Sequence, residues 1–540
     1  MTSKKMRNVV FAFASASLMG SLLIGVPAAK AATGANCKLT TPTAKAECDA
    51  ITVGAVGKVT SLDPSNSLRT SNQNYISKFL ISGMLWRIAS DGKPKKDLLS
   101  DAKQSSDGLT WTLTLKNIKY SDGKTQVVAD DAVFMFELLK KAPVPQLAVI
   151  EDISAPDAKT IVIKTKSRFN DLPYAMAGIY FWMHPRALAS DPKYWEAPLS
   201  AGPYRIKEWK LGDDKMVIEA NPNYWAKPAV KQVTYLAIPD PVTRVIALRQ
   251  GTIDYAFDLP AAIARGQLAD KNVFRWQPTQ LQGTFTLDFN LRDMEGCKDK
   301  VVSAASCLPV KTQPWHNPKV RQALSMAVNR KAIGDIAFFG DVKPSCALTW
   351  PGHPAYKCQN PDRTKQNLAG AKKLLAEAGY PDGFPITITV FNRPGWADAI
   401  SIIAADWRKL GSKMVVTTEP QTDAVGGARQ TSGEYQVQFS GATGALPAQL
   451  LNIYWGKGGA WQNWSGSSSN SADLAALDAA VTEKDQIALV AAIEKKIWEE
   501  SAHIPVGQRA VFGASRLPAN IFSNVKGNDH YFVKQSPPLS

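Results

Sequence analysis

The amino-acid sequence predicts an exported protein of the α/β class. Three observations lead to this prediction: an N-terminal segment typical of secretion, a remaining length of about 510 residues, and alternating strand and helix patterns in the second half of the chain. That length is enough for several domains of about 100–200 residues each. Alternating strands and helices favour lobes in which helices cover a sheet.

The first 31 residues have the pattern of a secretory signal peptide. Lys4, Lys5 and Arg7 form the positive start, residues 9–26 form an apolar stretch, and Ala-Lys-Ala at residues 29–31 is a cleavage site with small residues. A membrane anchor is the alternative, but serines and glycines interrupt the stretch, which falls short of the roughly 20 apolar residues of a span. We therefore expect cleavage after residue 31.

Composition and charge are those of a globular protein. Hydrophobic residues make up 45% of the chain and charged residues 20%, which is ordinary for a folded domain. The formal net charge of +16 includes four positive residues of the leader, and the other lysines and arginines are scattered without a basic run. A solvated basic surface explains this better than a nucleic-acid site. We expect no nucleic-acid partner.

Six cysteines follow the leader in three local pairs. The pairs are Cys37 with Cys48, Cys297 with Cys307, and Cys346 with Cys358. An even count in an exported chain predicts disulfides within these pairs, although six cysteines permit 15 connectivities. The close spacing of zinc-binding cysteines is absent, so no metal is expected. Cys37 also lies too far beyond the apolar stretch to be a lipid-attachment site, so we expect the mature protein to move freely in a periplasm.

Strand patterns dominate the first half of the chain. Trp111, Leu113 and Leu115 alternate with threonines, as in a half-buried strand. Asp122-Gly123 marks a turn, and a helix is expected over residues 129–141, with two acids near its positively polarised start. Further strands are expected over residues 160–165, 216–220 and 233–238.

The second half mixes helices with strands. Asn317 is a suitable N-cap and Pro318 a suitable first residue for a helix. Apolar spacing and terminal glycines predict helices over residues 368–378 and 398–410, with a buried strand over 386–391 between them. Late helices are expected over residues 474–477 and 487–498.

Motifs of enzyme chemistry are absent. None of the five histidines stands in a metal-ligand or H-E-x-x-H pattern, and G-x-S-x-G and G-x-G-x-x-G do not occur. Gly123-Lys124-Thr125 resembles the end of a phosphate-binding loop, but Ile118 occupies the place of its first glycine. We therefore expect no catalytic residues, no cofactor and no metal, although catalytic groups can also come from distant segments.

Ordered segments throughout the mature chain resemble the family 5 extracellular solute-binding proteins, the peptide, nickel and opine class that serves ABC importers. The matching segments are Leu62-Asp63-Pro64, DGLTWTLTL from Asp107, YSDGK from Tyr120, ADDAVFMFELL from Ala129, AGPYRIKEW from Ala201, NPNYW from Asn221, RVIALRQGTIDYA from Arg244, NPKVRQALSMAVNRKAI from Asn317 and AKKLLAEAGYPDGF from Ala371.

The resemblance implies a two-lobe periplasmic binding protein (Venus flytrap) with an extra subdomain in the first lobe. The expected first lobe covers residues 32–275, with the subdomain at about 76–194, and the second lobe covers 276–505. Residues 506–540 would return to the first lobe, so the chain would cross twice, near 275–290 and 500–510. The family also implies a monomer that delivers solute to the membrane subunits of an importer. Tyr204 and Trp225 are expected to pack the first lobe, and Arg321 to bind a local acid or carbonyl.

The ligand contacts implied by the resemblance come from variable loops. They are Asn72, Gln73, Thr284, Trp350, Arg393, Trp396, Phe439, Ser440 and Thr443. Peptide binders of the family have an aspartate that pairs with the peptide's ammonium at the position of Thr443, and residues 435–472 contain no acid. We therefore expect this part of the site not to bind an ammonium, because a buried charge needs a partner. Arg393 would instead favour a ligand carboxylate.

The identity of the solute stays open at this stage. A modified peptide, an opine-like acid, an oligosaccharide or an aromatic acid would all suit the family, and nickel is disfavoured by the few histidines. A secreted hydrolase with an unrecognised active site is the alternative from another class, and a chaperone-like exported protein is a third.

Overall fold

The computed structural model describes most of the chain between residues 37 and 517. The described residues are 37–38, 47–65, 80–88, 94–141, 149–170, 172–177, 181–256, 259, 265–270, 275–291, 313–349, 356, 358, 364–432, 434–443, 451, 471–480 and 482–517. The expected leader, Asn72, Gln73, Trp350, Cys297 and Cys307 lie outside these residues.

One sheet of 11 strands runs through the molecule in the order β15-β14-β16-β13-β17-β12-β2-β11-β10-β9, with β1 paired to β2. The strands of this sheet are β15 Val416–Gln421, β14 Ile386–Phe391, β16 Val437–Thr443, β13 Arg275–Phe289, β17 His503–Ser515, β12 Tyr255–Ala256, β2 Glu47–Ala55, β11 Val230–Ala237, β10 Lys215–Ala220, β9 Tyr204–Glu208 and β1 Cys37–Lys38. Strands from both ends of the chain therefore share one sheet.

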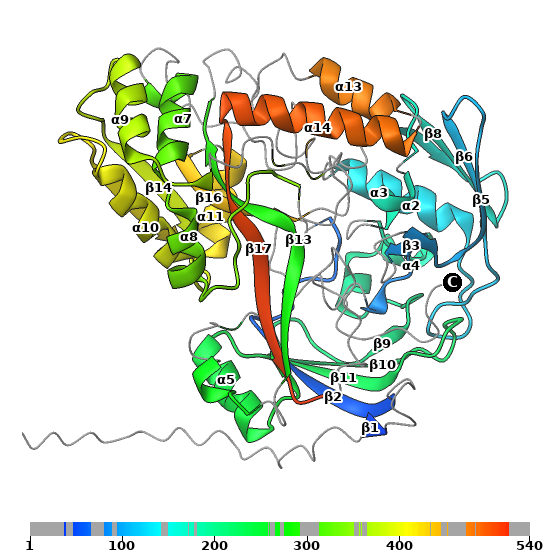
Figure 1. Ribbon diagram of the computed structural model, residues 1–540. Coiled ribbons are helices and arrows are strands. Elements are labelled where there is room, and N and C mark those ends of the chain that lie inside the picture. Colours follow the sequence, from blue (N-terminus) through cyan, green and yellow to red (C-terminus); the bar gives the residue numbers. More distant parts are fainter. Residues whose placement is uncertain are drawn as a thin grey trace, which may run out of the picture.

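The long strands β13 and β17 connect the two halves of this sheet. They pair antiparallel from Arg275 opposite Ser515 to Asp288 opposite His503. The register is irregular between Gln280 and Thr284 and again between Phe285 and Thr286. Figure 1 shows them side by side through the middle of the molecule, between the β2–β11 end and the β14–β16 end. These are the segments at which we expected the chain to cross between lobes.

A second sheet, β5-β6-β8-β7, forms a unit with its own core. Its strands are β5 Leu99–Gln104, β6 Thr110–Leu115, β8 Thr160–Thr165 and β7 Ile150–Ser154, and a hairpin of β3 Trp86–Ile88 and β4 Pro94–Lys96 lies beside it. Helices α2 Ala129–Lys141, α3 Leu172–Met176 and α4 Arg186–Ala189 and the 3-10 turn η2 Pro192–Glu196 complete the unit. Buried side chains between Met84 and Ala201 form its hydrophobic core, and the expected subdomain at about 76–194 stays a prediction.

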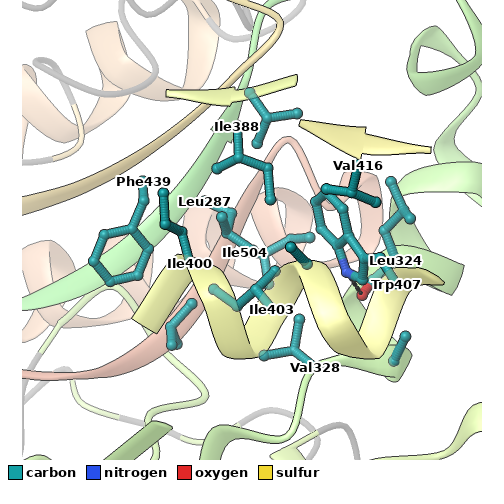
Figure 2. Close-up of a cluster of buried hydrophobic side chains, with 14 of the residues drawn as sticks. Leu287, Leu324, Val328, Ile388, Ile400, Ile403, Trp407, Val416, Phe439 and Ile504 are labelled. Carbon is teal, nitrogen blue, oxygen red and sulfur yellow. Dashed lines mark hydrogen bonds between the residues drawn. The ribbon is translucent and has the colours of Figure 1, made fainter. Parts of the chain in front are cut away.

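Helices cover one face of the β14–β16 end. They are α7 Pro318–Ala327, α9 Leu368–Glu377 and α10 Trp396–Arg408, with the short η6 Pro314–His316, α8 Arg330–Ala332 and the π-turn η7 Ile333–Ala337 nearby. Figure 2 shows Ile403 and Trp407 of α10 packed against Leu287, Ile388 and Ile504 of three strands. The strands contribute alternate residues to this core, as the period of a strand requires.

Further helices complete the described part of the chain. They are α5 Pro241–Gln250, α11 Asp423–Ser432, α13 Ser471–Ala479 and α14 Glu483–Glu500. In Figure 1, α13 and α14 extend from the side of α7 toward β6 and β8. None of the helices in the described part of the chain is long and apolar enough to cross a membrane.

Several expected elements have the predicted bounds, because local signals define them. The helix over 129–141 and the strands over 160–165 and 386–391 match α2, β8 and β14. The Asn317 side chain accepts a hydrogen bond from the Lys319 amide and caps α7 as predicted. The α10 helix begins at Trp396, two residues earlier than expected, after Gly395 in the left-handed conformation (φ 78°).

Two of the three motif residues have the structural roles expected of them. Tyr204 is fully buried, and the Arg321 guanidinium donates to the carbonyls of Trp315, His316 and Glu500. Trp225 is different, because 37% of it is exposed. Its indole N–H donates to the Asp97 carboxylate at 2.9 Å, and the Lys116 ammonium lies 3.9 Å from its ring. Trp225 therefore lies between the buried Asp97 carboxylate and solvent, and it is not a core residue.

Candidate functional site

Strands β13 and β16 bring two of the expected ligand contacts to one place. Thr284 is opposite Ala442, and Gly283 is opposite Thr443. The Thr284 side chain is buried, and its hydroxyl donates to the Ala347 carbonyl at 3.2 Å. The backbone of residues 345–349 is therefore attached to the sheet beside the end of β16.

Ser440 belongs to a buried polar network on the sheet face opposite the aromatic core. Its hydroxyl donates to Asp288, and it lies 3.2 Å from the Thr286 hydroxyl. The second oxygen of Asp288 is 2.9 Å from His503 Nδ1, and these side chains are all buried. Asp288 stands between the serine and the histidine, whereas nucleophilic catalysis requires the histidine to contact the serine directly. The cluster does not have the geometry of a hydrolase triad.

Phe439 and Trp396 are core residues in this structure. Phe439 is fully buried and stacks on Phe285 with ring centres 5.5 Å apart, and Trp396 meets both rings edge-on. We expected Trp396 in a loop because it follows Pro394 and Gly395, but it is the first residue of α10. Both residues are buried in this conformation, and a contact of either with ligand stays a prediction.

Arg393 lies in the turn between β14 and α10. Its guanidinium is 4.9 Å from the Phe391 ring and 5.1 Å from the Trp396 ring, and the residue is partly exposed. Stacking on aromatic rings holds a guanidinium in one orientation and leaves its in-plane N–H groups directed away from the ring faces. This geometry suits a carboxylate partner, and contact with a ligand stays a prediction.

Sequence reasoning missed a buried acid that is attached to the 345–349 segment. Glu494 on α14 is buried, and one carboxylate oxygen accepts a 2.5 Å hydrogen bond from the Thr349 amide. Burial raises the pKa of the Glu494 carboxyl to about 7. The sequence E-K-K around Glu494 indicates an exposed helix face, whereas in the structure Thr349 of the 345–349 segment contacts its carboxylate.

Disulfide bonds occur in two separate parts of the described chain. Cys346 and Cys358 are bonded, with Cα atoms 5.2 Å apart, as the local pairing predicted. Cys48 is disulfide-bonded, and the strand register places Cys37 opposite it. The pairing of Cys37 with Cys48 and that of Cys297 with Cys307 stay predictions.

Contacts also join segments that we assigned to different lobes. The Asn170 side-chain amide, after β8, donates to the Ala480 carbonyl beside α13 at 3.2 Å. Arg265 forms an ion pair with Asp341 and donates to the Phe339 carbonyl at 2.9 Å. Among the residues that the structure describes, no group of three or more His, Cys, Asp or Glu side chains could hold a metal ion.

Comparisons with known proteins agree with this architecture. Residues 93–463 match the model of the bacterial extracellular solute-binding proteins, family 5. The glutathione-binding protein GsiB of Salmonella paratyphi A is 27% identical over 492 residues, which cover 84% of this chain and 88% of that protein.

Solved structures show the same fold. The periplasmic binding protein AgaA in complex with agropinic acid, from A. tumefaciens R10, superposes with a TM-score of 0.76 at 24% identity, covering 90% of this chain and 99% of AgaA. The protein DppA of Helicobacter pylori in complex with the peptide STSA has a TM-score of 0.76 at 21% identity, covering 90% and 97%. The chain therefore belongs to the family 5 bacterial extracellular solute-binding proteins and has the two-lobe fold of periplasmic binding proteins.

Proposed function

We propose that this solute-binding protein captures a small peptide-like or opine-like solute between its lobes and delivers it to an ABC importer without chemical change. The family and its similarity to GsiB support the solute-binding role. In this proposal residues 1–31 are a cleaved leader, residues 32–275 the first lobe with a subdomain at about 76–194, and residues 276–505 the second lobe. Residues 506–540 return to the first lobe, and the mature protein acts as a periplasmic monomer.

The observation that carries the proposal is the pair of strands β13 and β17. They join the two ends of the sheet, and their register is irregular between Gln280 and Thr286. Register irregularities interrupt the ladder and let a strand bend. A two-stranded connection that bends locally is suited to a hinge, at which a few residues absorb the rotation of two rigid bodies.

Contacts on both sides of this connection fit a closed state. The Asn170–Ala480 hydrogen bond and the Arg265–Asp341 ion pair each join segments more than 70 positions apart. Arg265 and Asp341 are partly exposed, so their ion pair is worth little by itself. Because these contacts between the lobes are weak, the binding of solute can determine the equilibrium between open and closed forms.

Similarity to known binding proteins narrows the class of solute. GsiB binds glutathione, DppA is complexed with a peptide and AgaA with agropinic acid. All three ligands are small polar molecules with carboxylates, which matches the stacked guanidinium of Arg393. We propose that Asn72, Gln73, Thr284, Trp350, Arg393 and Thr443 contribute contacts to such a solute.

A binding panel with a chemical readout tests the proposal. Calorimetric titration with glutathione, di- and tripeptides and opine acids should find a solute that binds with one-to-one stoichiometry. Mass spectrometry should then recover this solute intact after prolonged incubation. Hydrolysis of the solute would favour the secreted hydrolase instead, and failure of the folded protein to bind any member of the panel would contradict the proposed class.

A further inference from the structure

The turn after η7 contains a phenylalanine in a backbone conformation that its side chain disfavours. Phe339 has a φ of 53°, in the left-handed region, where a Cβ atom crowds the neighbouring carbonyl. Helices often end with a residue in this conformation, but that residue is usually glycine. In this turn glycine comes one position later, as Gly340 with a φ of 82°. The conformation of Phe339 therefore has a cost that other contacts must offset.

A guanidinium from a distant segment contacts this turn. Arg265 donates through Nη1 to the Phe339 carbonyl at 2.9 Å, and its Nη2 pairs with the Asp341 carboxylate. One planar guanidinium therefore binds the turn at two points. Three residues after Arg265, Leu268 is fully buried in the hydrophobic cluster that includes Val245 of α5. Arg265 is thus attached to the part of the fold that contains α5.

The turn itself is attached to the other end of the sheet and to the crossing strand β17. Val342, directly after the turn, is buried in the core of the β14–β16 end. The Lys343 carbonyl accepts from the Gln508 amide of β17 at 2.9 Å. Gln508 is opposite Thr284, where the register of β13 and β17 becomes irregular. Rotation about these strands would therefore move the turn relative to Arg265.

The stabilising contacts and the backbone cost are of similar size. A left-handed residue other than glycine disfavours a conformation by about 5- to 30-fold. The side chains of Arg265 and Asp341 are 48% and 22% exposed, and an exposed ion pair contributes only about 1.5- to 5-fold. The bond from Arg265 to the Phe339 carbonyl and that from the Gly340 amide to the Gly334 carbonyl at 2.8 Å supply the rest. Loss of Arg265 from this set would leave the cost of the left-handed backbone uncompensated.

We propose that the Phe339–Gly340 turn is a conformational switch coupled to closure of the lobes. In the closed form Arg265 holds Phe339 in the left-handed conformation. In the open form the guanidinium moves away, and Phe339 relaxes to a conformation with negative φ. The inference rests on the lobe closure of the proposed function and adds a means of regulating it. The cost of the left-handed Phe339 opposes closure, so that the empty protein favours the open form until solute binds.

Two substitutions at one position separate the side chain from the backbone. Phe339→Ala removes the ring but retains the cost of the left-handed conformation, whereas Phe339→Gly removes both. In calorimetric titrations Phe339→Gly should bind glutathione about 5-fold more tightly than Phe339→Ala, the lower end of the cost, because glycine also gains freedom in the open form. Without solute, Phe339→Gly should also have the smaller radius of gyration in small-angle scattering.

Ser501 is the matched control, because it is left-handed (φ 50°) at the C-cap of α14. Its amide and hydroxyl donate to the Ile497 and Trp498 carbonyls of its own helix. Ser501→Gly and Ser501→Ala should therefore bind glutathione with equal affinity. Combined with Arg265→Ala, the two substitutions of Phe339 should also become equal, since the closed form no longer holds the turn.

Equal affinities and equal radii of gyration for Phe339→Gly and Phe339→Ala would overturn the inference, because the turn would then have one conformation in both forms. A difference that persists when Arg265 is replaced by alanine would overturn it as well. If neither glutathione nor another member of the binding panel binds the wild type, the proposed solute class fails and the scattering data alone decide. A smaller radius of gyration for Phe339→Gly would then support the switch, and an equal radius would overturn it.

Discussion

Asp97 joins Arg87 to Tyr224 and Trp225 from a distant part of the chain, and its removal should be strongly destabilising. The carboxylate is fully buried and accepts from Arg87 Nε at 2.5 Å, from the Tyr224 hydroxyl at 2.5 Å and from the Trp225 indole at 2.9 Å. Arg87 is fully buried as well. The substitution Asp97→Ala would leave a buried guanidinium without its carboxylate, which costs about 3–5 kcal/mol.

Equilibrium urea unfolding, followed by circular dichroism, measures this loss. Asp101→Ala is the control, because the Asp101 side chain is 47% exposed and its ion pair with Lys103 of the same strand is exposed as well. The double substitution of Arg87→Met with Asp97→Ala should recover part of the stability, since no unpaired charge is then buried. An Asp97→Ala protein as stable as the Asp101→Ala control would refute the reasoning that this buried cluster stabilises the fold.

Three further measurements follow from the structure. Trp407 is fully buried and its indole N–H donates to the Leu324 carbonyl at 3.0 Å. Trp407→Ala should therefore lower the free energy of unfolding by about 3–5 kcal/mol in urea titrations. An unchanged urea midpoint would contradict its core position. Replacing Cys346 and Cys358 by serine should cost about 3 kcal/mol from loop entropy, seen as a lower melting temperature, and added reductant should lower the melting temperature of this variant by less than that of the wild type. Burial raises the pKa of Glu494 in the folded protein to about 7, so the folded protein retains this proton where the unfolded chain loses it. The free energy of unfolding should therefore fall by on the order of 3 kcal/mol as the pH rises from about 4.5 to about 7. Glu494→Gln should remove this pH dependence, and a wild-type slope in that variant would refute the assignment.

Local sequence signals predicted those elements that local interactions define. Asn317 and Pro318 begin α7 because capping and a preset backbone angle need only neighbouring residues. The alternation around Trp111 predicted β6 because one face of that strand packs on the subdomain core. The start of α10 was missed because Gly395 precedes it without a side-chain cap, so proline and glycine there indicated a loop.

Long-range packing determined what the sequence pattern could not. Asp97 stands in the polar segment DGKPKKD and has no local feature that predicts burial. It becomes a buried acceptor because Tyr224 and Trp225 arrive from about 130 positions further along the chain. Glu494 is similar, since the Thr349 amide that its carboxylate contacts comes from the 345–349 segment. Alignment placed Phe439 in a strand but did not show which face of the sheet it occupies or that its ring stacks on Phe285.

Small-angle scattering in the absence and presence of solute tests the central claim most directly. The protein would first be freed of solute by partial unfolding and dialysis, and then titrated with glutathione or with the solute found in the binding panel. Rotation about β13 and β17 predicts that the radius of gyration decreases with the same stoichiometry as calorimetric binding. Saturated binding with an unchanged radius of gyration would contradict closure of the two lobes over the solute.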